Sequence, residues 1–182
     1  MNQCTGFLLG NRIVVFDYDC ANKIYWNGYY GTFLGVYKPK SKEINSPLEL
    51  SLIEAVDLVE KRRLKVIEGN KELTIPELVE TGKARIQKFT SLLKVYIDLR
   101  RRGFIPRRGL KFGCDYLVYK LGPGIDHAPF GVLVYTERER VDPIELVRAG
   151  RLLHSVRKKL VIAIVNEDSS DVKYMVLNWW KP

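Results

Sequence analysis

The sequence predicts a mixed α/β (α+β) protein with two domains: a small N-terminal α/β domain over residues 1–94, and a C-terminal mixed-sheet domain with a flanking helix over residues 95–182. Two observations lead to this prediction. In the first half, strand-like runs alternate with amphipathic helical patterns. In the second half, strand-like runs dominate and one capped helix separates them. The composition changes over residues 95–104, so the domain boundary is expected close to that stretch.

Two hairpins are predicted in the N-terminal domain. The run GFLLGNRIVVFD turns at Gly10-Asn11, and the run RLKVIEGNKELT turns at Gly69-Asn70, where glycine and asparagine favour tight turns. Between the hairpins, VYKPKSKEINSP is polar and rich in lysine, with a proline near each end, which is typical of a loop.

Local signals also predict helices in the first half of the chain. Capping-box patterns, in which a hydroxyl residue is followed three positions later by a glutamate, predict helix starts at Ser51 and Thr74. The second of these helices is expected to end near Gly82. A longer helix is predicted from Ile86, because large apolar residues recur at helical spacing as far as Leu99.

The second half is predicted to be mainly sheet. GFIPRRGLKFG, DYLVYK and FGVLVYT alternate as strands do. Asp142-Pro143 has the form of an N-cap and a first helical residue, so a helix is expected from there to about Val156. KLVIAIV is typical of a strand buried on both faces. After the polar turn NEDSSD, VKYMVLNWW is predicted as a final strand with an apolar edge that invites pairing.

The chain carries a large positive charge. Its 30 lysine and arginine residues against 21 aspartate and glutamate residues give a net charge of +9 and a pI near 9.5. This excess favours a polyanionic partner, nucleic acid before a membrane, because phosphate contacts release bound counterions. The densest basic stretch, residues 100–111, is explained equally well by phosphate binding and by cations at a helix C-terminus.

Composition argues against several classes of protein. No apolar run reaches the roughly 18–20 residues that cross a bilayer. Cys4, Cys20 and Cys114 are odd in number and widely spaced, and together with two histidines they offer no zinc-ligand spacing. We therefore expect no metal and no cofactor, and a cytoplasmic protein in a reducing compartment.

Three side chains suggest a chemistry. Tyr119 and His127 flank a Gly-Pro-Gly loop between two predicted strands, so a phenol and an imidazole can approach each other. Lys158 is one of three consecutive basic residues leading into the buried strand, at least one of which must point toward the sheet; Lys159 is the alternative. Metal-free RNA cleavage needs a base for the 2′-hydroxyl, an acid for the departing 5′-oxygen and a cation for the phosphorane. Tyrosine suits the base role only if nearby cations, such as Lys158 or arginines, lower its pKa.

Each of these residues also has an ordinary structural explanation, since strand tyrosines, loop histidines and helix-end cations are common. A metal-dependent nuclease is the competing chemistry. It needs clustered carboxylates, often with an acid-x-lysine pair, and Asp171-Val-Lys173 has that form. This pair follows the polar turn NEDSSD, which is more typical of a solvated hairpin tip.

Two long runs, GLKFGCDYLVYKLGPGIDHAPFGVLVY and LVRAGRLLHSVRKKLVIAIVN, closely resemble the catalytic subunit of the archaeal tRNA-splicing endonuclease (tRNA-intron endonuclease) family. GYYG and LELSLIEAVDLVE resemble the family's N-terminal domain, and VKYMVLNWWKP resembles its last strand. The resemblance implies a catalytic triad of Tyr119 as general base, His127 as general acid and Lys158 as stabiliser of the phosphorane. The implied products are a 2′,3′-cyclic phosphate and a 5′-hydroxyl, formed without a metal.

The resemblance also implies a substrate and partners. The family cleaves precursor tRNA at bulge–helix–bulge motifs and holds flipped bulge bases between arginines, a role that falls on Arg151 here. The loop GVYKPKSKEINSP is longer than in the shortest members, which implies RNA contacts by Lys38, Lys40 and Lys42. It also implies a heterotetramer of two catalytic and two structural subunits, with a homotetramer as the alternative. In the family, an acidic loop corresponding to NEDSSD docks on a neighbouring subunit. A non-catalytic structural or RNA-binding subunit is the other class of function.

Overall fold

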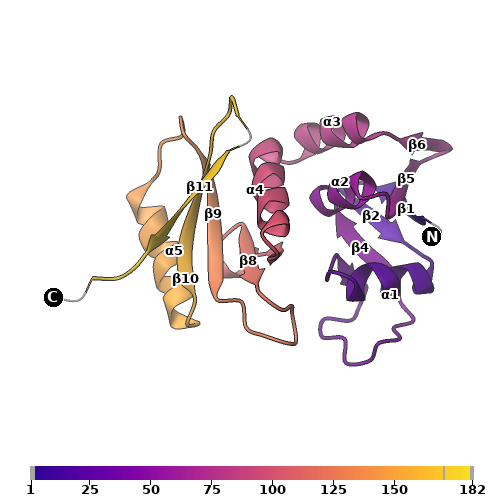
Figure 1. The fold of residues 1–182 in the computed structure, drawn as a ribbon, viewed down its shortest axis with the longest axis horizontal. Helices are drawn as coiled ribbons and strands as arrows, with labels where there is room; N and C mark the ends of the chain where they lie inside the picture. The colour runs from indigo at the N-terminus through magenta and orange to yellow at the C-terminus, as the bar shows by residue number, and fades with distance from the viewer. Residues whose placement is uncertain (1–2, 170, 181–182) are drawn as a thin grey trace. The chain divides into compact units, whose positions relative to one another are not determined.

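The chain folds into two compact units, Met1–Phe89 and Thr90–Pro182, each built around its own mixed β-sheet (Figure 1). In this computed structural model, residues 3–169 and 171–180 are described. Both units combine helices with a sheet, so the predicted mixed α/β class is confirmed. No helix among these residues is long and apolar enough to cross a membrane.

The first unit contains a six-stranded sheet in the order β3-β4-β2-β1-β5-β6. Only β1 and β5 run parallel, and the other neighbours are antiparallel. The two predicted hairpins are confirmed, with Gly10 and Gly69 at positive φ in their turns. The strands are β1 (Cys4–Leu9), β2 (Arg12–Val15), β3 (Thr32–Phe33), β4 (Leu48–Ser51), β5 (Leu64–Glu68) and β6 (Lys71–Leu73), and the helices are α1 (Tyr18–Trp26), α2 (Leu52–Glu60) and α3 (Ile75–Arg85).

Both predicted capping boxes are confirmed. The Ser51 hydroxyl accepts a hydrogen bond from the Glu54 N–H at the start of α2, and the Glu54 carboxylate accepts one from the Ser51 N–H. Thr74 opens α3 in the same way. The predicted end of α3 near Gly82 is wrong, because the helix continues to Arg85. Gly82 is needed for packing rather than termination, since a Cβ at this position would overlap the ring of Phe89.

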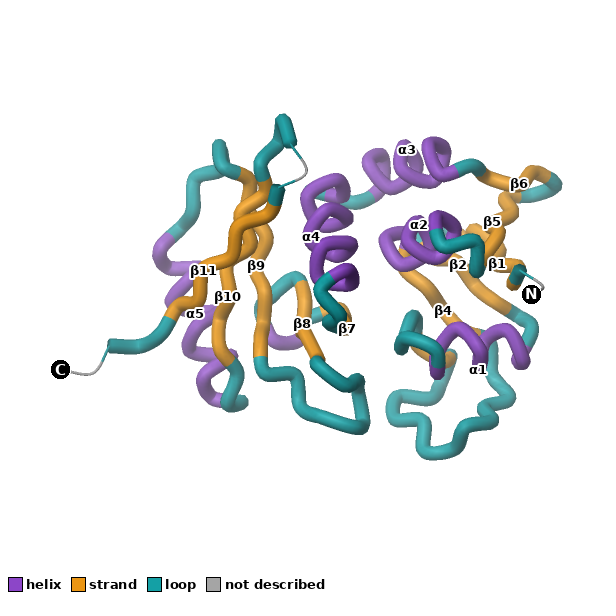
Figure 2. Tube along the Cα trace, viewed as in Figure 1, coloured by secondary structure: helices purple, strands orange, loops and turns teal. Residues whose placement is uncertain are grey.

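The second unit contains a five-stranded sheet in the order β11-β10-β9-β8-β7 (Figure 2). Strands β9 and β10 are parallel, and the remaining pairs are antiparallel. Its elements are α4 (Phe89–Arg101), β7 (Ile105–Arg108), the 3₁₀ turn η1 (Leu110–Phe112), β8 (Tyr116–Tyr119), β9 (Phe130–Thr136), α5 (Pro143–Ser155), β10 (Lys159–Val165) and β11 (Val172–Leu177).

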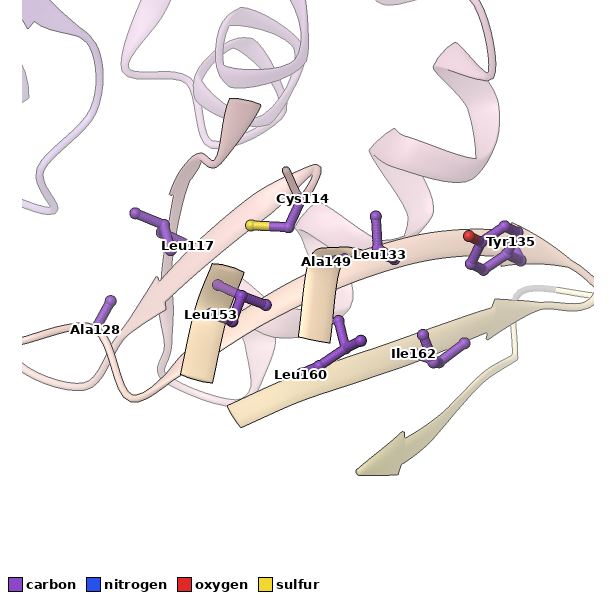
Figure 3. Close-up of a cluster of buried hydrophobic side chains, with 9 residues drawn as sticks. All are labelled: Cys114, Leu117, Ala128, Leu133, Tyr135, Ala149, Leu153, Leu160 and Ile162. Atoms are coloured by element: carbon purple, nitrogen blue, oxygen red, sulfur yellow. The ribbon is translucent and has the colours of Figure 1, made fainter. Parts of the chain in front are cut away.

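Helices cover both faces of this second sheet. Helix α5, capped at Asp142 as predicted, contributes Ala149 and Leu153 to a buried cluster that it shares with residues of β8, β9 and β10 (Figure 3). Gly131 on β9 allows this close packing, because a Cβ there would lie 2.5 Å from Leu153 of the helix. Helix α4 lies on the opposite face, where the Tyr116 hydroxyl donates to the Leu92 carbonyl. Burial on both faces explains the continuous apolar sequence of β10.

Three predicted element boundaries, one just before the second unit and two within it, are wrong. Ile86 does not belong to the long helix: its backbone is extended, and α4 begins at Phe89. The stretch Leu110–Phe112 forms a 3₁₀ turn instead of continuing a strand. The final strand stops at Leu177 rather than including residues 178–180, because its ladder with β10 ends where Leu160 pairs with Leu177.

A disulfide that sequence reasoning did not foresee joins Cys4 on β1 to Cys20 on α1, with their Cα atoms 5.7 Å apart. The two cysteines lie 16 residues apart in the chain and become neighbours only through the tertiary fold, in which α1 packs against the first sheet. Cys114 is free and buried in the second unit. Burial raises the pKa of its thiol to about 11, so this cysteine is a core residue rather than a nucleophile.

Candidate active site

The three candidate catalytic residues come from three neighbouring segments of the second unit. Tyr119 is the last residue of β8, His127 lies in the connection that leads to β9, and Lys158 directly precedes β10. Because β8 runs antiparallel to β9, and β9 parallel to β10, the end of β8 and the starts of β9 and β10 lie at the same end of the sheet. This end of the sheet is the lower one in Figure 1. The topology therefore brings the phenol of Tyr119, the imidazole of His127 and the ammonium of Lys158 to one end of the sheet.

The side chain of Lys158 has defined contacts at this end of the sheet. Its ammonium donates a hydrogen bond to the Ala128 carbonyl at 2.9 Å and lies 6.0 Å from the centroid of the Phe112 ring. Ala128 directly follows His127, so the cation sits beside the peptide of the candidate acid. Lys159 differs from Lys158: it begins β10, its N–H donates to the Pro129 carbonyl, and its side chain is exposed.

Tyr119 faces the α5 side of the sheet. It is half-buried against the same cluster that contains Leu117 and Ala128, as expected from the alternation of side chains along β8. Burial raises the pKa of its phenol above the usual value of 10, and the Asp126 carboxylate adds to that shift. Arg107 on β7 lowers the pKa, but less than burial raises it. The expectation that nearby cations lower the pKa of Tyr119 is therefore wrong for the net shift: Arg107 acts in that direction, but burial outweighs it and the phenol stays protonated at neutral pH.

His127 is exposed and follows a loop that one carboxylate organises. The Asp126 side chain accepts hydrogen bonds from the backbone N–H groups of three residues, Lys120, Leu121 and Gly122. Burial alone would raise the pKa of Asp126, but these hydrogen bonds lower it below its usual value. Sequence reasoning missed Asp126. The available signal was an aspartate after a glycine-rich turn, a residue type that commonly accepts hydrogen bonds from nearby peptide groups.

The candidate RNA-binding residues lie in both units. Arg151 is exposed on α5 and lines a groove with His154 and Trp180. A larger adjoining groove of about 770 Å³ runs between α5 and Trp179 and reaches Lys158 and Lys159. The loop lysines belong to the first unit, in the irregular segment between β3 and β4, and all are exposed: Lys38, Lys40 and Lys42.

Part of the basic stretch 100–111 is engaged within the second unit. The Arg100 guanidinium donates to the Tyr96 hydroxyl, and Arg102 forms an ion pair with Asp98 at 2.7 Å. Arg100 lies in the last turn of α4 and Arg102 directly follows the helix, where cations complement the helix dipole. Of the two explanations that the sequence left open, phosphate binding and cations at a helix C-terminus, the second therefore describes these two residues.

The acid-x-lysine pair that suggested a metal site lies at the β10–β11 hairpin. The Asn166 N–H donates to the Asp171 carbonyl, closing the turn, and Lys173 is exposed on β11. Among the residues that the structure describes, no three histidine, cysteine, aspartate or glutamate side chains are grouped as metal ligands. The turn is tied to α4, because the Lys94 ammonium donates to the carbonyls of Asn166 and Ser169.

Comparison with known proteins defines the class of enzyme. Residues 89–174 match the family described as tRNA intron endonuclease, catalytic C-terminal domain, and residues 4–79 match the tRNA intron endonuclease, N-terminal domain. The chain therefore carries the catalytic domain of an endonuclease. The tRNA-splicing endonucleases of Hyperthermus butylicus and Saccharolobus islandicus are each 45% identical over 176 residues, and that of Saccharolobus solfataricus is 43% identical. Each alignment covers 96% of this chain and 97% of the relative. The chain belongs to the tRNA-splicing endonuclease family.

Proposed function

We propose that this enzyme cleaves precursor tRNA at intron boundaries within bulge–helix–bulge motifs, without a metal or other cofactor. The products are a 2′,3′-cyclic phosphate and a 5′-hydroxyl. The observation that carries the proposal is the placement of Tyr119, His127 and Lys158 on segments at the same end of the second sheet. The relatives, named as tRNA-splicing endonucleases, support the substrate, and the net charge of +9 suits an RNA partner.

In this mechanism, the small fraction of molecules in which Tyr119 is ionised is the reactive one, and its phenolate takes the proton of the 2′-hydroxyl at the cleavage site. The 2′-oxygen attacks phosphorus, a bond forms from phosphorus to that oxygen, and the bond from phosphorus to the 5′-oxygen breaks. His127 gives its proton to the departing 5′-oxygen. The Lys158 ammonium stabilises the extra negative charge on the non-bridging oxygens of the phosphorane. Tyr119 and His127 then regain their starting protonation states by exchange with water.

The choice of Lys158 over Lys159 rests on local geometry. The Lys158 ammonium is within hydrogen-bonding distance of the Ala128 carbonyl, next to His127, and can exchange that partner for a phosphate oxygen. A positive charge already fixed near the reacting phosphate needs little reorganisation during the reaction. Lys159 lines the same groove as Lys158, but its side chain is exposed and its backbone N–H donates to the Pro129 carbonyl.

Recognition of the bulge is assigned to Arg151, with Lys38, Lys40 and Lys42 as further RNA contacts. Unpaired bases expose their faces, and a guanidinium plane stacks on such a face. The exposed position of Arg151 on α5, in a groove that also contains Trp180, supports this assignment. An Arg151→Ala variant should bind a bulged RNA more weakly than wild type but cleave the bound RNA at a similar rate.

The assembly that we propose is a heterotetramer of two catalytic and two structural subunits, with a homotetramer as the alternative. Two features support pairing with other chains. The edge strand β11 exposes apolar side chains at Met175 and Val176. The hairpin 166–171 carries the carboxylates of Glu167 and Asp168, which form ion pairs with Arg138 of the same chain and stay accessible enough to bind a basic surface on a neighbour instead. A cytoplasmic location follows from the substrate. The disulfide is compatible with it where intracellular proteins are disulfide-rich, as in hyperthermophilic archaea.

Two other readings have clear tests. A non-catalytic subunit would bind bulged RNA without cleaving it when alone, and His127→Ala would leave the cleavage rate of an assembly with a catalytic partner unchanged. A metal-dependent nuclease would lose activity in EDTA. We expect instead that His127→Ala and Lys158→Ala each slow cleavage by orders of magnitude while the Kd for RNA and the melting temperature stay near wild type. If either variant loses RNA binding and folding together, that residue is structural and its catalytic assignment fails.

A further inference from the structure

The Asp126 side chain accepts hydrogen bonds from the backbone of the loop that connects Tyr119 to His127. The Oδ2 atom of Asp126 accepts hydrogen bonds from the Lys120 N–H at 3.0 Å and the Leu121 N–H at 3.2 Å. Its Oδ1 atom accepts one from the Gly122 N–H at 2.8 Å. Both carboxylate oxygens are therefore occupied by consecutive peptide groups on the far side of the loop.

These bonds link the residue next to Tyr119 to the residue next to His127. Lys120 directly follows Tyr119, and Asp126 directly precedes His127. Within the loop, the N–H groups of Ile125 and Asp126 both donate to the Gly122 carbonyl at 3.1 Å. The loop thus closes on itself immediately beside the phenol and the imidazole.

The loop needs such a constraint because its sequence is permissive. Gly122 and Gly124 both have positive φ, and glycine adopts many backbone conformations when nothing holds it. Hydrogen bonds to an ionised carboxylate are stronger than those between neutral groups. The pKa of Asp126 is lowered, so the carboxylate is ionised at neutral pH and can accept all three bonds.

We propose that Asp126 is a positioning residue of the active site: its carboxylate fixes the separation of Tyr119 and His127, so that base and acid face the same phosphodiester. This inference rests on the proposed function, because it assigns Asp126 a role through the two residues that transfer protons. It requires a carboxylate, since the nitrogen of an asparagine amide cannot accept a hydrogen bond and only one acceptor oxygen would be left.

An electrostatic role for Asp126 predicts the opposite result. Its negative charge raises the pKa of Tyr119, so removing the charge increases the fraction of phenolate. If Asp126 acted only through its charge, an Asp126→Asn variant would cleave faster than wild type at pH 7. The positioning role predicts slower cleavage, because a misplaced acid or base costs more than the added phenolate gains.

The test compares Asp126→Asn and Asp126→Ala with wild type under single-turnover conditions, at saturating bulge–helix–bulge RNA and well below the melting temperature. We expect Asp126→Ala to slow cleavage on the order of 10²-fold, and Asp126→Asn by less, with the Kd for RNA unchanged. Asp142→Asn is the matched control: Asp142 also accepts a backbone N–H, from Ile144 at 2.8 Å, but caps α5 instead of the loop. Wild-type or faster cleavage by both Asp126 variants would overturn the proposal, as would a loss confined to the Kd.

A second substrate identifies the route of the effect. In an RNA whose scissile 5′-oxygen is replaced by sulfur, the leaving group departs without protonation, so a defect in the acid is suppressed. The rate loss of Asp126→Ala should shrink on this RNA, as should that of His127→Ala. An undiminished loss for Asp126→Ala alone would refute positioning of His127. A His127→Ala loss that is undiminished would refute the proposed acid itself, which distinguishes failure of the function from failure of this inference.

Discussion

Raising the pH should speed cleavage by a His127→Ala variant steeply, if Tyr119 is the base. Burial raises the pKa of Tyr119 above 10, so at pH 7 fewer than about one molecule in 10³ carries the phenolate. Below that pKa the phenolate fraction grows tenfold for each pH unit. With the sulfur-substituted RNA, no acid is needed, and the rate should follow the phenolate alone. We predict an increase of about 100-fold between pH 7 and pH 9, with no levelling below about pH 10.

The assay is a series of single-turnover measurements in EDTA, with the fraction of cleaved RNA quantified over time. A His127→Ala, Tyr119→Phe double variant gives the background rate, which is subtracted at each pH. Arg107→Gln provides a test in the other direction. The Arg107 charge lowers the pKa of Tyr119, so its removal should slow cleavage between pH 7 and pH 9 without changing the slope. A rate that levels off below pH 9, or that survives in Tyr119→Phe, would show that another group is the base.

Three further predictions concern the lysine pair, the disulfide and the core. Lys158→Ala should lower the single-turnover rate by roughly 10²–10³-fold, whereas Lys159→Ala should stay close to wild type; equal losses would reject the distinction between them. Cys4→Ser should lower the free energy of unfolding by about 3 kcal/mol, measured by urea denaturation, because the disulfide closes a loop of this length. A reductant should then destabilise wild type but leave the variant unchanged. Leu153→Ala should cost about 2–5 kcal/mol in the same measurement, since Leu153 is fully buried against Gly131; a loss below 1 kcal/mol would contradict the packing described.

Local sequence signals predicted the elements whose stabilising contacts are also local. The capping boxes at Ser51 and Thr74 join residues three positions apart, and the sequence pattern alone identifies both helix starts. Gly82 misled the prediction because its role depends on the ring of Phe89, which a local pattern does not reveal. The disulfide between Cys4 and Cys20 was missed for the same reason, since tertiary folding brings those residues together.

The same distinction holds for the candidate site. The strand order that brings Tyr119, His127 and Lys158 to one end of the sheet follows from two connections: the loop 120–129 joins the antiparallel strands β8 and β9, and a helical crossover joins the parallel strands β9 and β10. The contacts at that end of the sheet could not be predicted: the Lys158 ammonium donates to the Ala128 carbonyl, and the Asp126 carboxylate accepts hydrogen bonds from three peptide N–H groups across the loop. The catalytic roles of the three residues stay predictions.

The ends produced by cleavage test the central claim most directly. The purified chain should be incubated with a bulge–helix–bulge RNA in EDTA, first alone and then with candidate partner subunits, and the new termini identified by mass spectrometry. The proposed mechanism predicts a 2′,3′-cyclic phosphate on one fragment and a 5′-hydroxyl on the other. Cleavage that requires a divalent metal, or that leaves a 3′-hydroxyl and a 5′-phosphate, would contradict it.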